Sequence, residues 1–510
     1  MLLALALIAV AAAPLLDLGA TQVRGGRAAL DGFVLVAVSG LVLLHVLPHA
    51  VQTGGPMVVA IAGVGMFLPL MIENLTRDAA SSAHAWALRV ALVGLVVHAA
   101  LDGAALYHGH EPELAWAVIL HRIPAALTVW VLLRPSRGVW IASGLLLAMA
   151  GATIVGWSLG PSLQALDERL LGMFSGLVAG SLLHVVVHRP HHHPEPGEST
   201  IGGIGALLGL GAVGLPLLAH PEDLAIGVAY SVALAAGPAL LLGVSLAVFL
   251  RRIVPLPAPE QLAELSAPIA TVWGLFHPCT RSEVEALEGA SGGATAFCIA
   301  TRGVGPVSAL VAAAVLGPVF AILLLVSTLT LSTLSGLMLG SAGGEAHTHP
   351  PKTTLPLIGA VPWLVIGIAL VPLASSMPAM ALTPLVLLAA PFQVHPVSAI
   401  LVAAGLAASG TETGALMAMI LAATTTGLPT LRTIAHHHGR TRAVASLALT
   451  CFFSAGLGVL VQPAYQPTGD SFGALSLPVI ALLVAIALLL DGPRGLLESM
   501  RQVPHDHAHP

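Results

Sequence analysis

Apolar runs of about 20 residues recur along the whole chain, and they constrain its fold more than any other feature of the sequence. A helix needs about 20 apolar residues to cross the hydrocarbon core of a bilayer, and we count roughly fifteen or sixteen such runs. The composition is 56% hydrophobic and only 8% charged, with a mean hydropathy of +0.93, which excludes a soluble globular protein. The sequence therefore predicts an all-α polytopic protein of the lipid bilayer.

Charge and cysteine content exclude several other classes of protein. The formal net charge of −5 is small and dispersed, and no basic stripe is present, so we expect no nucleic-acid partner. Cys279, Cys298 and Cys451 are too scattered for a disulfide framework, and no CxxC motif occurs. An intramembrane metalloenzyme is disfavoured because HExxH is absent, so we predict that the chain is not an enzyme.

The arginines of the first 220 residues predict a membrane topology. Eight spans are expected near residues 2–19, 30–50, 56–75, 84–108, 113–133, 138–158, 168–188 and 201–219. The loops after the odd spans carry arginine, whereas those after spans two, four and eight carry neither Lys nor Arg. Because Lys and Arg are retained in the cytoplasm, we predict that the N-terminus lies outside and the C-terminus in the cytoplasm. The membrane that we expect is the bacterial inner membrane. The first run lacks a positive n-region, so we interpret it as a span and not as a signal peptide.

Two consecutive spans carry titratable residues at membrane depth. His98 and Asp102 lie on the fourth expected span, and His121 and Arg122 lie on the fifth. A charged side chain at the centre of the bilayer costs roughly 2.5 to 3.5 kcal/mol unless a partner, a metal or water offsets it. His98 and Asp102 are four residues apart and share a helix face, and imidazole and carboxylate suit a divalent cation such as zinc. These residues predict a transport pathway.

Prolines accompany the histidines of the second and fifth spans. His45 and His49 flank Pro48, and Pro124 follows His121. A proline frees a backbone carbonyl one turn back, which is tolerated in lipid only where protein or a cavity can satisfy it. An alternative remains open in which the histidines are hydrogen-bonded interior or interfacial residues without a metal: His45, His49, His184 and His188.

Residues 1–220 resemble the ZIP family of divalent-metal transporters. The segment His45 to Ala50, HVLPHA, resembles the family's second-span HLLPEA, and the segment Gly63 to Glu73 resembles its third span. His98 to Gly103, HAALDG, is similar to HNxxDG, and His121 to Ala125, HRIPA, is similar to HExPH. The resemblance implies an eight-span bundle that moves zinc or related metals, with His98, Asp102 and His121 as ligands. It also implies supporting or transport roles for further residues: His45, His49, Glu73, Arg122 and His184.

Three departures from the ZIP pattern bear on this metal centre. Ala99 replaces the family's Asn, Arg122 its metal-bridging Glu, and Ala125 its second His. Arginine cannot ligate a cation, but it can form a bidentate pair with Asp102 and stand in for a second metal. Either one metal binds His98, Asp102 and His121, or none binds and the block is a scaffold. No tightly bound cofactor is expected, and Zn²⁺ or another divalent metal is predicted as substrate.

A repeat of about 120 residues organises the rest of the chain. His277-Pro278 precedes a segment that ends at Pro306, and His395-Pro396 precedes a similar segment that ends at Pro429. Short segments interrupted by Gly and Pro in matching halves are typical of broken helices around a midplane binding site. We therefore predict two domains, 1–220 and 221–510, the second being a two-repeat bundle with broken or re-entrant helices and a His-rich C-terminal tail.

Residues 222–490 resemble a two-repeat predicted-permease family that includes bacterial organoarsenical efflux permeases. Pro278-Cys279-Thr280 preserves part of that family's Pro-Cys-Ser-Cys-like turn, although the second cysteine is absent. The candidate pathway residues of this block are His277, Cys279, Arg281, Glu283, Arg302, His395, Glu412 and Thr424. Two alternatives to a pathway role remain open. The Glu and Arg side chains form an ion pair that only fixes a hairpin, and the threonines only satisfy backbone groups of their own helices.

Histidine tracts outside the spans, such as His436 to His438 and His505 to His509, either hold zinc, copper or nickel or serve as polar linkers.

Two functions follow from the sequence. The first is an inner-membrane transporter of divalent metal cations. The alternative is a permease that exports an unrelated small solute, with a degenerate, non-conducting ZIP-like domain. The oligomeric state is open, with a homodimer among the alternatives.

Overall fold

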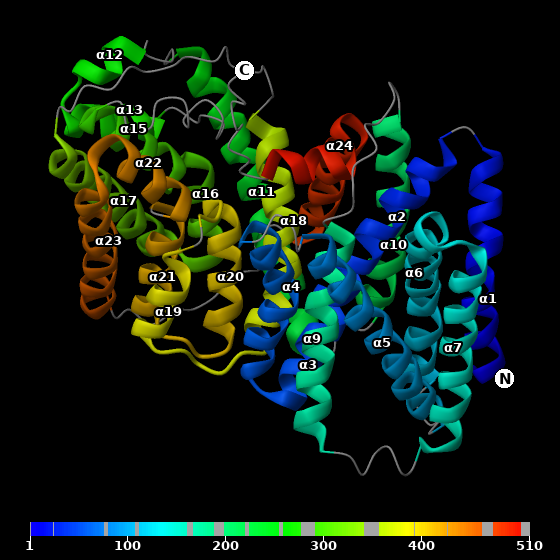
Figure 1. The fold of residues 1–510 in the computed structure, drawn as a ribbon. Helices are drawn as coiled ribbons and strands as arrows, with labels where there is room; N and C mark the ends of the chain where they lie inside the picture. The colour runs from blue at the N-terminus through cyan, green and yellow to red at the C-terminus, as the bar shows by residue number, and fades with distance from the viewer. Residues whose placement is uncertain are drawn as a thin grey trace. The chain divides into compact units, whose positions relative to one another are not determined.

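The chain folds into helices (Figure 1). The computed structural model describes residues 2–23, 25–75, 80–107, 112–160, 167–187, 198–219, 224–253, 259–276, 291–340, 356–391, 393–425, 427–461 and 473–500. Within these ranges every regular element is a helix. The chain divides into two units: unit 1 comprises Met1–Ile226 with Ala485–Leu496, and unit 2 comprises Gly227–Val484 with Leu497–Pro510.

Several helices are long and apolar enough to cross a membrane. Within the described residues there are six, or up to eight if each of two bent helix pairs counts as one span. Large apolar side chains lie on outward faces: Trp140 is 89% exposed, Leu460 82% and Phe452 79%. Such faces suit contact with lipid. The chain is a multi-pass membrane protein, as its composition predicts.

A helix occupies each of the eight spans expected in the first 220 residues. The elements are α1 (Leu2–Gln22), α2 (Gly26–Leu41), η1 (Val42–Val46), α3 (Leu47–Gly54), α4 (Met57–Leu75), α5 (Ala80–Tyr107), α6 (Pro112–Arg137), α7 (Val139–Ser158), α9 (Glu168–Val187) and α10 (Glu198–Ala219). The second span is composite, because a π-helical turn, η1, joins α2 to α3. Residues 485–496, within α24 (Gly473–Met500), also belong to unit 1.

Pro48 explains the π-helical turn of the second span. Its ring nitrogen cannot donate to the carbonyl of Leu44, one α-helical turn back. The backbone widens instead, and the N–H of Leu47 donates to the carbonyl of Val42, five residues back. His45 lies within this turn and His49 just after it, so their four-residue spacing is not one regular α-helical turn.

Glycines bring helix pairs of unit 1 into backbone contact. A Cβ at Gly205 of α10 would overlap the carbonyl oxygen of Ala29 in α2, and one at Gly180 of α9 would overlap that of Ala62 in α4. A Cβ at Gly203 of α10 would overlap the carbonyl oxygen of Leu488 in α24. Small residues at such crossings allow the close packing that drives helix association in membranes.

Unit 2 contains two broken helix pairs. Its elements are most of α11 (Leu224–Ile253), α12 (Pro259–Glu264), α13 (Ala267–Phe276), α15 (Gly292–Arg302), α16 (Pro306–Leu316), α17 (Pro318–Leu339), α18 (Pro356–Ser375), α19 (Leu382–Ala389), α20 (Pro396–Ala408), α21 (Thr413–Thr425), α22 (Leu428–His438), α23 (Arg440–Leu460) and part of α24. The pair α15 and α16 is bent by 40°, and the pair α21 and α22 by 55°. The broken helices predicted from the Gly- and Pro-rich repeat are therefore present.

The backbone itself repeats between the two pairs. Gly317, which precedes α17, has φ 94° and ψ 152°, and Gly439, which precedes α23, has φ 89° and ψ 156°. This left-handed region favours glycine because a Cβ would be strained there. Gly305 and Gly427, which precede α16 and α22, are separated by the same number of residues as Gly317 and Gly439. The same glycine turns therefore recur at the same spacing in the two segments.

Candidate functional site

A buried ionic centre joins three helices of unit 1. Arg122 of α6 is only 2% exposed, and its Nη2 lies 3.3 Å from Oδ2 of Asp102 on α5. The same nitrogen donates to the carbonyl oxygen of Ala99 at 3.1 Å, and Nη1 donates to Oγ1 of Thr153 on α7. The guanidinium is thus held by a carboxylate, a carbonyl and a hydroxyl oxygen.

His98 extends this centre along α5. Its Nε2 lies 3.5 Å from Oδ1 of Asp102, and its side chain is 28% exposed. His121 belongs to α6, but its side chain lies outside the described residues. Among the side chains that the structure does describe, no group of three or more His, Cys, Asp or Glu could hold a metal ion. Of the three predicted ligands, the structure therefore describes the side chains of two, His98 and Asp102, which lie next to each other.

The sequence offered Asp102 as a partner for Arg122, and the structure places the two side chains in an ion pair whose 3.3 Å contact runs through a single nitrogen. Only Nη2 contacts the carboxylate, because Nη1 is engaged by Thr153. Thr153 is fully buried and also donates to the carbonyl of Met149 at 2.8 Å. The sequence carried one signal for this missed residue, a hydroxyl within the apolar run of α7.

Glycines fix the distance between α5 and α7 beside the ionic centre. A Cβ at Gly103 would overlap the carbonyl oxygen of Thr153, and a Cβ at Gly156 would overlap that of Ala100. The two backbones therefore touch, and this contact sets where Thr153 stands relative to the Arg122 guanidinium.

We expect Gly103→Ala to lower the free energy of unfolding by about 1–3 kcal/mol, because backbone atoms cannot yield to the added methyl group. The matched control is Gly151→Ala on α7, where an added Cβ meets nothing within 4 Å and gains up to about 1 kcal/mol of helix propensity. Thermal unfolding of the purified protein in detergent measures both. Equal midpoints for the two variants would show that the close contact is not needed.

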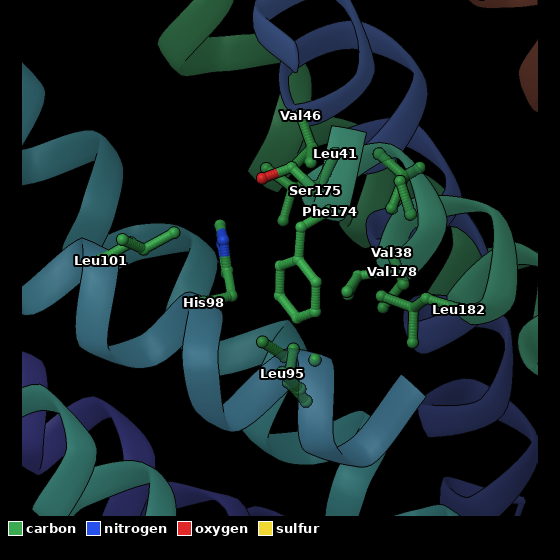
Figure 2. Close-up of a pocket in the computed structure, with 14 residues that line it drawn as sticks. Val38, Leu41, Val46, Leu95, His98, Leu101, Phe174, Ser175, Val178 and Leu182 are labelled. Atoms are coloured by element: carbon green, nitrogen blue, oxygen red, sulfur yellow. The ribbon is translucent and has the colours of Figure 1, made fainter. Parts of the chain in front are cut away.

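A small apolar cavity of about 40 Å³ adjoins His98 (Figure 2). Its lining includes Val42 and Val46 of η1 and Phe174 of α9, and among the lining residues that the structure describes only His98 and Ser175 are polar. The volume equals that of about three or four water molecules, at about 10–15 Å³ each. His98 therefore stands between an apolar cavity and the carboxylate of Asp102.

The other histidines of unit 1 lie in different surroundings. His184 is fully buried, and its Nδ1 lies 3.0 Å from the carbonyl oxygen of Met66, as in the alternative of a hydrogen-bonded interior histidine. His45 and His49 are exposed. Glu73 belongs to α4, but its side chain lies outside the described residues.

A second ion pair in unit 1, between a buried carboxylate and a half-buried arginine, was not predicted. Asp17 of α1 is 6% exposed and pairs with Arg134 near the end of α6. The indole nitrogen of Trp130 donates to the same carboxylate oxygen at 2.9 Å. An acidic residue within the first apolar run was the available signal. The pair ties α1 to α6 close to the helix ends.

In unit 2, a polar contact joins the two broken helix pairs. Nη1 of Arg302, the last residue of α15, donates to Oγ1 of Thr430 in the first turn of α22 at 3.0 Å. Arg302 is half-buried and Thr430 is fully buried. Because each residue lies at the break of its own pair, the contact brings the two breaks together.

The α19–α20 connection satisfies backbone groups at the second break. Val394 N–H donates to the carbonyl of Ala423 at 2.8 Å, and Leu428 N–H donates to that of Pro391 at 3.1 Å. His395 follows directly and caps α20, its Nδ1 accepting from Val397 N–H at 3.3 Å while its ring stacks on Trp363. The break is thus held by protein groups, which is the condition under which irregular backbone is tolerated inside a membrane.

The remaining predicted pathway residues differ in surroundings. Thr424 is fully buried and donates to the carbonyl of Ile420 at 2.8 Å, as in the alternative of a threonine that satisfies helix backbone. Glu412 is exposed just before α21. Four further residues lie outside the described ranges: His277, Cys279, Arg281 and Glu283.

Comparisons of the chain with models of protein families, with curated proteins and with solved structures give no match.

Proposed function

We propose that the chain is a membrane transporter whose solute passes through unit 2, between the two broken helix pairs. The contact between Arg302 and Thr430 carries this proposal, because it joins the breaks of both pairs. Interrupted helices in structural repeats are how many transporters build a substrate site near the midplane. The resemblance of residues 222–490 to a permease family supports the same conclusion. The proposal includes the inner membrane, an outside N-terminus and a cytoplasmic C-terminus.

Arg302→Ala is expected to lower the transport rate at least about tenfold, equivalent to about 1.4 kcal/mol, by removing the group that links the two breaks. Purified protein in vesicles would be tested with a panel of divalent metals and an organoarsenical. The control is Arg432→Ala, an exposed arginine of α22, which should transport like the original protein. Equal transport by both variants would exclude Arg302 from the pathway.

A second function, transport of a divalent metal by unit 1, is favoured by one observation. His98 and Asp102 place an imidazole and a carboxylate 3.5 Å apart at the edge of a cavity. These are the ligand types of zinc. Zinc that copurifies with the protein and is lost in a triple alanine variant of His98, Asp102 and His121 would support this function. A metal content that the triple variant leaves unchanged would favour a small-solute permease with a non-conducting first unit.

A further inference from the structure

We infer that Arg122 is a resident cation, whose guanidinium fills an oxygen-lined cation site in unit 1 and keeps that site closed to cations from solution. The inference concerns unit 1 alone and does not depend on the transport route proposed for unit 2.

The donor set around the guanidinium is that of a cation site. A carboxylate from Asp102, a carbonyl from Ala99 and a hydroxyl from Thr153 converge on its two terminal nitrogens. Carboxylate, carbonyl and hydroxyl oxygens are the groups with which proteins bind hard cations. Here they are matched to a planar, permanently charged group with several N–H donors.

The oxygens would remain in place without the arginine side chain. Ala99 and Asp102 belong to α5, whereas Thr153 belongs to α7, and the two helices touch at Gly103 and Gly156 independently of α6. Truncation of Arg122 therefore leaves a space of guanidinium size beside oxygens whose spacing is set by backbone contact. This space would contain a carboxylate with only 11% of its side chain exposed.

Without the Arg122 guanidinium, the Asp102 carboxylate keeps its neighbour His98 but loses its permanently charged partner, so a cation at the vacated position would be stabilised. A free guanidinium ion has the shape and the donors of the missing group. The cavity beside His98 lies next to Asp102, since His98 both lines it and contacts the carboxylate.

The test is chemical rescue of Arg122→Ala by guanidinium chloride in detergent solution. At about tenfold excess over its dissociation constant, guanidinium should raise the unfolding midpoint of the variant by about 3–6 °C. Sodium chloride at the same ionic strength and urea at the same concentration should not. The original protein should show no rise, because Arg122 already fills the site.

Two further variants separate binding from folding. Asp102→Asn combined with Arg122→Ala removes the carboxylate and should abolish the rescue. Arg122→Met fills most of the space without charge and should respond to guanidinium less than Arg122→Ala. If Arg122→Ala gains no more from guanidinium than the original protein does, the inference is overturned.

If Arg122→Ala folds poorly, the yield of folded protein tests the inference instead of the unfolding midpoint. Its yield would then be compared after extraction with and without guanidinium chloride. Recovery only with guanidinium supports the resident cation. Failure in both cases, alongside normal recovery of the Asp102→Asn and Arg122→Ala double variant, would mean that the vacated position does not take up a cation.

Discussion

Asp102→Ala is expected to lower the free energy of unfolding of unit 1 by about 3–5 kcal/mol, because it leaves the Arg122 guanidinium buried without its carboxylate. Breaking a buried pair from one side is costly because the remaining charge keeps its desolvation penalty. Ala99 and Thr153 would still accept from the guanidinium, but neither carries charge. Thermal unfolding in detergent should show a midpoint lower by on the order of 10 °C.

Two variants control this experiment. Glu168→Ala removes an exposed carboxylate from the first turn of α9 and should cost no more than about 1 kcal/mol. Asp102→Asn combined with Arg122→Met removes both charges, and most of the lost stability should return, because neutral replacements of a buried pair are often tolerated. If Asp102→Ala unfolded at the midpoint of Glu168→Ala, the ionic centre would contribute nothing to stability.

Gly414→Ala is expected to abolish transport and to lower the stability of unit 2 by about 1–3 kcal/mol or more. A Cβ at this first-turn position of α21 would overlap the carbonyl oxygen of Gly458 in α23. Helix α21 would have to move away from α23, and its broken continuation α22, which carries Thr430, would move with it. Vesicle transport and thermal unfolding are both measured.

The chain offers a control position for this experiment and a corresponding position at which it can be repeated. Gly456→Ala lies on α23, where an added Cβ meets nothing within 4 Å, so function should be kept and stability should not fall. Gly292 in α15 corresponds to Gly414, and a Cβ there would overlap the carbonyl oxygen of Gly336 in α17. Gly292→Ala should therefore match Gly414→Ala. A harmless Gly414→Ala would show that the packing of α21 on α23 can adjust.

The sequence alone determined the features that depend on local patterns. Apolar runs located the eight helices of the first 220 residues, because the bilayer admits only segments of that length and polarity. Glycine and proline located the two broken pairs, because they alter the backbone where they stand. That Arg122 needs a partner followed from the cost of an isolated charge in lipid, and Asp102 was the candidate that the sequence offered.

Only the tertiary structure decided which side chains meet across helices. Thr153 on Arg122, Arg134 on Asp17 and Thr430 on Arg302 join residues that are far apart in sequence. The placement of residues 485–496 in unit 1 is likewise a long-range feature. An apolar run specifies that a helix forms, but its neighbours are set by glycine contacts and side-chain shape summed over whole interfaces. That information resides in the packed chain and not in any local segment.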